Sequence, residues 1–70
     1  MTNNEIQSLR KMYPNGTRIK MVFMNDPDPI RRGELGTVEY VDDVGTLLVR
    51  WDNGRTLGLI PDVDRFVMVH

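Results

Sequence analysis

Apolar and polar residues alternate through the middle of the chain, between residues 33 and 61. The apolar positions at every second residue are Leu47, Val49 and Trp51, and then Leu57 and Leu59. Between these two runs lies Asp52-Asn53-Gly54, which is typical of a tight hairpin turn. The pattern predicts three successive antiparallel strands joined by two short turns.

The hairpin at Asn53 can form in two registers, which place opposite faces of the second strand in the core. A two-residue loop of Asn53 and Gly54 would leave Leu57 and Leu59 on the face of the preceding strand that carries Arg50. A three-residue loop with Gly54 in the left-handed conformation turns both leucines toward the core. The sequence predicts this second register, with Val49 facing Leu57 and Leu47 facing Leu59.

Residues 1–13 are predicted to form a helix. Thr2 with Glu5, or Asn4 with Gln7, has the spacing of a capping box. Helical spacing brings apolar side chains to one face, at Ile6, Leu9 and Tyr13. The helix should end before Pro14.

A first strand is predicted over residues 17–24, with Ile19, Met21 and Phe23 facing the core. The two prolines of the following segment cannot donate to a strand ladder, so residues 25–34 should form a loop.

A second strand is predicted over residues 35–41. Val38 and Val41 both suit a core but cannot share one face of a regular strand. We therefore expect a bulge near Glu39 and Tyr40.

The end of the chain should form a helical turn over residues 61–64 and a last strand over residues 65–69, which contributes Phe66 and either Val67 or Met68 to the core. The fold class expected is mainly β: a small five-stranded SH3-like barrel with a short N-terminal α-helix. It forms one domain, residues 1–70, with the helix at 1–13 and the barrel at 17–69.

The amino-acid composition argues against several classes of catalytic and metal-binding site. The chain has no cysteine and a single histidine, His70, which argues against disulfides, thiolate sites and structural zinc. Its only serine, Ser8, lies in the predicted helix, so no nucleophilic triad is apparent. The aspartates occur in turns, where that residue is favoured, and do not have EF-hand spacing. We expect no catalytic residue, no metal and no cofactor.

Much of the chain resembles a known family. The stretches YPNGTRI, LGTVEYVDDVGTLLVRWDNG and LGLIPDVDRF, together with the aspartate-proline loop, resemble a family of small bacterial domains that often occur in phages and in integrative or conjugative elements. The resemblance implies an SH3-like barrel and supplies no catalytic residue. Ile30-Arg31-Arg32 stands here in place of a longer proline-rich stretch. A narrower likeness, in residues 36–38 and 49–54, is to KOW and Tudor-type barrels, which bind nucleic acid or peptides.

Six residues are candidates for contact with a partner: Tyr40, Trp51, Arg31, Arg32, Arg18 and Lys20. The two aromatic residues suit recognition, but the only tryptophan of so small a domain also suits its core. The four cations suit phosphate groups, although Asp26, Asp28 and Glu34 lie near them in the sequence and would neutralise part of their charge.

The expected function is that of a small non-catalytic binding module, a protein-binding adaptor or accessory protein of a phage or mobile element. The alternative is a KOW-like nucleic-acid-binding module. Self-association could involve Val22, Met24 and Leu48, together with Met12, which are expected to face outward. No apolar run is long enough for a membrane helix and no signal peptide is apparent, so we expect a cytoplasmic protein without a membrane partner.

Overall fold

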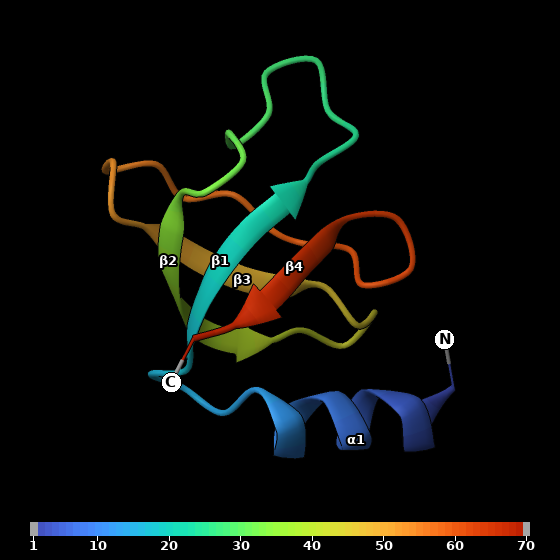
Figure 1. Cartoon of the computed structure of the whole chain (residues 1–70). Coiled ribbons are helices and arrows are strands. Elements are labelled where there is room, and N and C mark those ends of the chain that lie inside the picture. Colours follow the sequence, from blue (N-terminus) through green and yellow to red (C-terminus); the bar gives the residue numbers. More distant parts are fainter. Residues whose placement is uncertain (1, 70) are drawn as a thin grey trace.

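The computed structural model describes residues 2–69 and contains one helix followed by four strands. These elements are α1 (Asn3–Met12), β1 (Arg18–Phe23), β2 (Leu35–Val41), β3 (Leu47–Trp51) and β4 (Arg65–Met68). The strands form one antiparallel sheet in the order β3-β2-β1-β4 (Figure 1). The prediction of a mainly β fold with an N-terminal helix is confirmed. Met1, where the predicted helix begins, and His70 lie outside the described residues.

The prediction of a closed, five-stranded barrel is wrong, because the sheet is open and has four strands. The segment predicted as a further strand, residues 55–59, meets β3 only through isolated bridges, Arg50 with Thr56 and Leu47 with Leu59. Gly58 lies inside this segment and Pro61 follows it closely. A glycine brings no side chain to pack and a proline cannot donate to a ladder, so both weaken a strand here.

The predicted register of the Asn53 hairpin is confirmed. Leu47 and Leu59 exchange both backbone hydrogen bonds, of 2.9 and 2.8 Å, and the amide of Leu57 donates to the carbonyl oxygen of Val49 at 3.2 Å. Gly54 has a φ of +94°, the positive value that the three-residue loop requires. The aliphatic side chains on both arms of the hairpin therefore face the same core.

The bulge predicted in β2 is also confirmed. The pairing of β2 with β3 shifts between Val38 and Tyr40. Val38 and Val41 are consequently both buried, although they are three positions apart and would lie on opposite faces of a regular strand. Both residues of the bulge, Glu39 and Tyr40, lie opposite Leu48 on the outer side of the sheet.

A second bulge, in β1, overturns one predicted core residue. The pairing of β1 with β4 shifts between Met21 and Phe23, so Val22 is the inserted residue. The insertion reverses the alternation beyond it. Phe23, predicted to face the core, is 58% exposed, and Met24, predicted to face outward, is buried.

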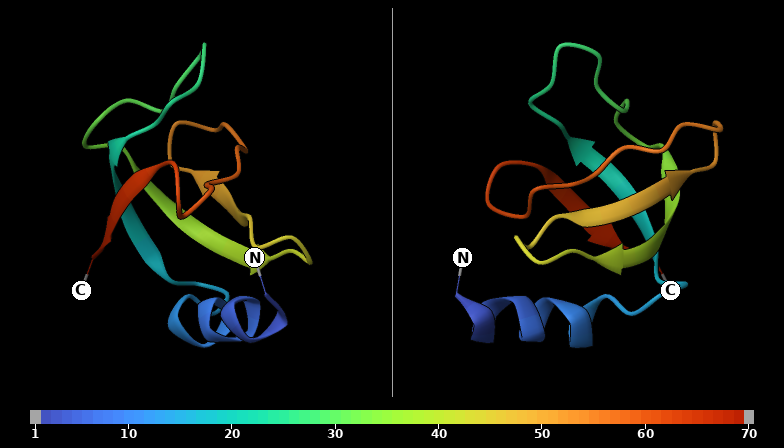
Figure 2. Two further views of the ribbon diagram at one scale, coloured as in Figure 1. Left: turned by 90° about the vertical axis from the view of Figure 1, so that its right-hand side faces the viewer. Right: turned by 180° about the vertical axis from the view of Figure 1, so that it is seen from behind.

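The core lies on one side of the sheet, and segments from outside the sheet complete it. Ile6 of α1 reaches this core, and the helix runs across one end of the sheet (Figure 2). The capping box of Thr2 and Glu5 is present, as predicted. The full set of buried apolar residues is Ile6, Ile19, Met21, Met24, Ile30, Val38, Val41, Leu47, Val49, Trp51 and Leu59.

The loop over residues 25–34 projects from the end of β1 (Figure 1), yet it is fixed to the body of the protein. Ile30 is buried, although the sequence places it within a charged stretch. From the Asn53 hairpin, the guanidinium of Arg55 donates to the carbonyl oxygens of Asp28, at 2.8 Å, and Pro29, at 3.3 Å. The loop is therefore held by an apolar side chain and by two hydrogen bonds from another segment.

Candidate functional site

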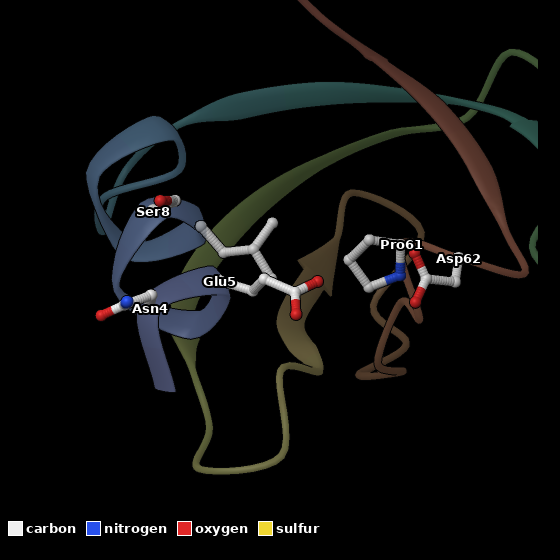
Figure 3. Close-up of a pocket in the computed structure, with 6 residues that line it drawn as sticks. Asn4, Glu5, Ser8, Pro61 and Asp62 are labelled. Carbon is white, nitrogen blue, oxygen red and sulfur yellow. The ribbon is translucent and has the colours of Figure 1, made fainter. Parts of the chain in front are cut away.

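A groove lies between α1 and the segment that leads into β4. It consists of two adjoining pockets, of about 290 and 240 Å³, which share Leu9 and Pro61 in their linings. Figure 3 shows the first of them, with side chains of the helix on one side and the turn at Pro61 on the other. We call these two pockets together the α1–β4 groove. Their remaining lining residues are Asn4, Glu5, Ser8, Tyr13, Asp62, Asp64, Arg65 and Phe66.

One wall of the groove is a face of α1 that the capping box fixes in place. The backbone amide of Thr2 donates to the carboxylate of Glu5 at 3.1 Å, and the amide of Glu5 donates to the hydroxyl of Thr2 at 3.2 Å. The hydrogen bond from the Thr2 backbone lowers the pKa of Glu5. Glu5 is therefore ionised at neutral pH, and its side chain points toward Pro61 and Asp62 (Figure 3).

The opposite wall is a turn that a buried carboxylate holds. Asp64 is buried, and its carboxylate accepts hydrogen bonds from the amides of Ile60, at 2.9 Å, and Asn25, at 3.2 Å. The amides of Val63 and Asp64 both donate to the carbonyl oxygen of Ile60. The helical turn predicted at residues 61–64 is thus present as one hydrogen-bonded turn.

Two aromatic rings line the inner end of the groove. The rings of Tyr13 and Phe66 meet edge to face, with centroids 5.4 Å apart and an interplanar angle of 61°. Both residues, together with Leu9, pack against the core while remaining partly exposed. This end of the groove therefore combines aromatic rings with the polar groups of Asp64 and Arg65, whereas its other end carries the carboxylates of Glu5 and Asp62.

The free edge of the sheet borders the groove. β4 is the last strand of the sheet, so its outer edge has no neighbouring strand among residues 2–69. The amide of Val69 donates to the carbonyl oxygen of Arg18 at 2.9 Å. Backbone N–H and C=O groups alternate in direction along a strand. The amides and carbonyls of Val67 and Val69 therefore point toward β1, and those of Phe66 and Met68 point away from the sheet. The outward groups of Phe66 and Met68 can therefore pair with an added strand.

The exposed side chains of β4 differ from the prediction. Phe66 is partly buried, as expected, but Val67 and Met68 are 46% and 38% exposed, so neither completes the core. Val69 beyond them is 37% exposed. The edge of the sheet thus carries a run of partly exposed apolar residues, which in monomeric proteins is an unusual way to end a sheet.

The structure separates the two aromatic candidates. The Trp51 side chain is fully buried, and its indole Nε1 donates to the carbonyl oxygen of Leu57 at 3.0 Å, so no face of the ring is available to a partner. Tyr40 is 58% exposed on the outer side of the sheet. Only Tyr40 of this pair can contact another molecule in this conformation.

The four cationic candidates are not gathered at one place. Arg18 and Lys20 lie on the outer side of β1, where the guanidinium of Arg18 makes two hydrogen bonds, of 2.8 and 2.7 Å, to the carboxylate of Asp52. Arg31 and Arg32 are exposed in the long loop. Arg32 lines a shallow hollow of about 420 Å³ together with Glu34, Leu35 and Asp52.

The apolar patch predicted for self-association does not form as expected. Met24 is buried, so it cannot contribute to a surface. Val22 and Leu48 are half-buried, and Met12 lies on the helix. The residues of the α1–β4 groove were not predicted, because the groove depends on how α1 lies relative to the segment that leads into β4. The sequence contains one indication of the groove: the alternation along the last strand predicts that Phe66, which lines the groove, faces inward.

Two further features of the described residues concern metal ions and membranes. Within residues 2–69, no three histidine, cysteine, aspartate or glutamate side chains lie close enough together to hold a metal ion. In the same part of the chain, no helix has both the length and the apolar character that crossing a bilayer demands.

Comparison with known proteins assigns the chain to a family. The family model described as Domain of unknown function (DUF4314) matches residues 2–69. The chain belongs to the DUF4314 family. No curated protein and no solved structure matches it. The DUF4314 match includes α1 and all four strands, so the α1–β4 groove is built entirely from residues within the family domain.

Proposed function

We propose that this DUF4314 domain is a non-catalytic protein-binding module that accepts an extended segment of a partner as an additional strand beside β4. The observation that carries this proposal is the free edge of β4, with the outward backbone groups of Phe66 and Met68, directly beside the α1–β4 groove. In strand addition, backbone hydrogen bonds supply affinity and pockets for alternate side chains supply specificity.

The two faces of such an added strand would meet different surfaces. Side chains on its inner face would lie beside Phe66 and Met68 and enter the end of the groove that Leu9 and Tyr13 line. Side chains on its outer face would lie beside Arg65, Val67 and Val69. The partner segment should therefore carry apolar residues at alternate positions, with no proline where it pairs.

From the resemblance of the sequence, we further propose that the module is an accessory protein of a phage or mobile element and that it acts in the cytoplasm. The exposed apolar residues along β4 support a role in which this edge is covered by a partner.

A proline at Met68 tests the proposal directly. The amide of Met68 points away from β1, so Met68→Pro removes an outward donor without removing a hydrogen bond of the sheet. Random peptides of about twelve residues would be selected on the parent protein, and the affinity of those recovered would be measured by fluorescence polarisation. We expect Met68→Pro to weaken binding at least about tenfold.

Met68→Ala is the matched control, because it shortens the same side chain and keeps the amide. It should bind the selected peptides within about threefold of the parent, and both variants should melt cooperatively. Unchanged binding by Met68→Pro, or selected peptides that shift amide resonances away from Phe66 and Met68, would contradict strand addition at this edge.

A further inference from the structure

Four cationic side chains share the outer face of the sheet, the side opposite the core. Side chains alternate between the two faces of β1. Ile19 and Met21 are buried on the core side, so Arg18 and Lys20 lie on the outer face. Arg50 of β3 also lies on the outer face, because its neighbours Val49 and Trp51 are buried on the core side. The fourth cation is Arg65 of β4, which pairs with Phe23 of β1.

Strand pairing makes these cations neighbours. Thr37 of β2 pairs with Arg18 on one side and with Arg50 on the other, which places the two arginines in one row across three strands. Lys20 lies two residues beyond Arg18, about 7 Å along β1, and it pairs with Val67, which is two residues from Arg65. The cations thus form a continuous band from Arg50 to Arg65.

Two acids, Asp52 and Glu39, lie on the same face as these cations and neutralise part of their charge. Asp52 pairs with Arg18, at 2.7 Å between Nη2 and Oδ2. Lys20, Arg50 and Arg65 make no ion pair with any described residue. Of the acids that the sequence places near the predicted patch, Asp28 lies beside Arg55, and the Asp26 carboxylate accepts the amide of Asp28 within the loop. The third, Glu34, lines the hollow beside Arg32. The band is therefore positive on a chain whose net charge is −1.

The two bulges bring an exposed aromatic ring to each end of this band. Phe23 and Tyr40 are both 58% exposed on the outer face, Phe23 beside Arg65 and Tyr40 opposite Leu48. In Figure 1, β1 and β4 face the viewer with no segment over them, and the view from behind shows β3 and the segment leading to β4 on the far side (Figure 2, right). The outer face is therefore uncovered along β1 and β4 (Figure 1), and because β3 lies on the far side of the curved sheet (Figure 2), a partner that contacts the whole band must follow this curvature.

We infer that the outer face binds single-stranded nucleic acid, with Lys20, Arg50 and Arg65 contacting phosphates and Phe23 and Tyr40 stacking on bases. Cations that follow the backbone, combined with aromatic rings for the bases, are the usual means of binding single strands without sequence preference. An acidic peptide would use the cations but would leave both rings without a stacking partner. Arg65 belongs to both surfaces, because it also lines the α1–β4 groove. Lys20 and Arg50 lie outside that groove, so variants of these two residues test the inference apart from strand addition at β4.

Fluorescence anisotropy with labelled dT20 and rU20 tests the inference, and the comparison of the two distinguishes DNA from RNA. We expect both to bind at about 20 mM salt and to weaken steeply as salt rises, with a slope of log K against log salt near −2, since about 0.7 counterions are released for each of three phosphate contacts. The double variant Lys20→Glu with Arg50→Glu should lose at least about tenfold in affinity. Phe23→Ala and Tyr40→Ala should each lose at least about fivefold.

The matched control is Lys11→Glu with Arg31→Glu, which makes the same change in net charge away from the outer face. Its affinity should stay within about threefold of the parent. Any of four results would overturn the inference: no binding of either oligonucleotide at about 20 mM salt, equal losses in the two double variants, duplex DNA bound as tightly as single strands, or displacement by polyglutamate at equal charge.

Discussion

The indole of Trp51 is joined by a hydrogen bond of 3.0 Å to the carbonyl oxygen of Leu57, across the Asn53 turn. The ring is 1% exposed, so the donor of this bond belongs to the core, whereas its acceptor residue, Leu57, is partly buried. A side chain of β3 therefore helps to hold the segment after the turn, which meets that strand only through isolated bridges.

Replacement of Trp51 should remove most of the stability of the domain. Trp51→Ala is expected to lower the free energy of unfolding by about 3 to 5 kcal/mol, because it deletes a fully buried aromatic side chain. A loss of this size is enough to unfold a domain of seventy residues. Circular dichroism during urea titration would measure it, and a variant that melts like the parent would show that the ring does not support the fold.

Gly54 should resist replacement for a conformational reason. Its φ of +94° is unfavourable for residues with a Cβ, so Gly54→Ala should lower the free energy of unfolding by about 1 to 2 kcal/mol. No heavy atom lies within 4 Å of a Cβ added there, so crowding does not contribute. Gly54→Asn, which tolerates positive φ better, should lose less; equal losses in chemical denaturation would argue against this explanation.

Gly36 should resist replacement for a steric reason. A Cβ at this position would lie 2.7 Å from both Cε3 of Trp51 and Cγ1 of Val49. Gly36→Ala should therefore lower the free energy of unfolding by about 1 to 3 kcal/mol through overpacking. Glu39→Ala, on the outer side of the same strand, is the control and should change it by less than about 0.5 kcal/mol. A neutral Gly36→Ala would mean that the indole moves aside without loss.

Asp64 should matter for the wall of the α1–β4 groove. Asp64→Ala leaves the amides of Ile60 and Asn25 without their acceptor and should lower the free energy of unfolding by about 1 to 3 kcal/mol. The exposed neighbour Asp62, changed to alanine, should have little effect. Equal melting temperatures of the two variants in calorimetry would show that the carboxylate of Asp64 is not what holds the turn.

The ion pair of Arg18 and Asp52 predicts a pH dependence. The hydrogen bond from Arg18 lowers the pKa of Asp52, and the charge of Arg50 adds to this effect. A lowered folded-state pKa contributes stability above the unfolded value, near 3.9, that disappears as pH falls through the folded value. Arg18→Gln should therefore raise the pKa of Asp52 toward its ordinary value in an NMR titration.

The same variant should differ from the parent in stability at about pH 6, and this difference should shrink as pH falls through the folded-state pKa of Asp52, below which the carboxylate is protonated in both states. Arg31→Gln, in the long loop, is the control and should leave the titration of Asp52 unchanged. If the pKa of Asp52 is the same in Arg18→Gln as in the parent, the pair is not formed in solution.

The parts of the fold that could be predicted from sequence are those set by local chemistry. The register at Asn53 followed from the need to bury Leu57 and Leu59 on one face, and the bulge in β2 followed from the spacing of Val38 and Val41. The residues that decide the register and the bulge are close together in the chain, so the local pattern of apolar residues is enough to predict both features.

The predictions that were wrong concern features that depend on contacts between segments distant in the chain. The bulge at Val22 leaves no trace in the alternation of β1, because Phe23 and Met24 are both apolar and either could face the core. The open sheet depends on whether residues 55–59 pair fully with β3, which their composition does not decide. The outer band of cations combines β1 with Arg50 and Arg65, residues that only the strand order brings together.

The contact of Arg55 with the carbonyl oxygens of Asp28 and Pro29 has a consequence for motion. The projecting loop and the hairpin turn are separate in sequence, but neither can swing away without breaking the same pair of hydrogen bonds. Opening of one should accompany opening of the other as a single cooperative unit in hydrogen exchange, and trypsin should reach Arg31 and Arg55 at similar rates.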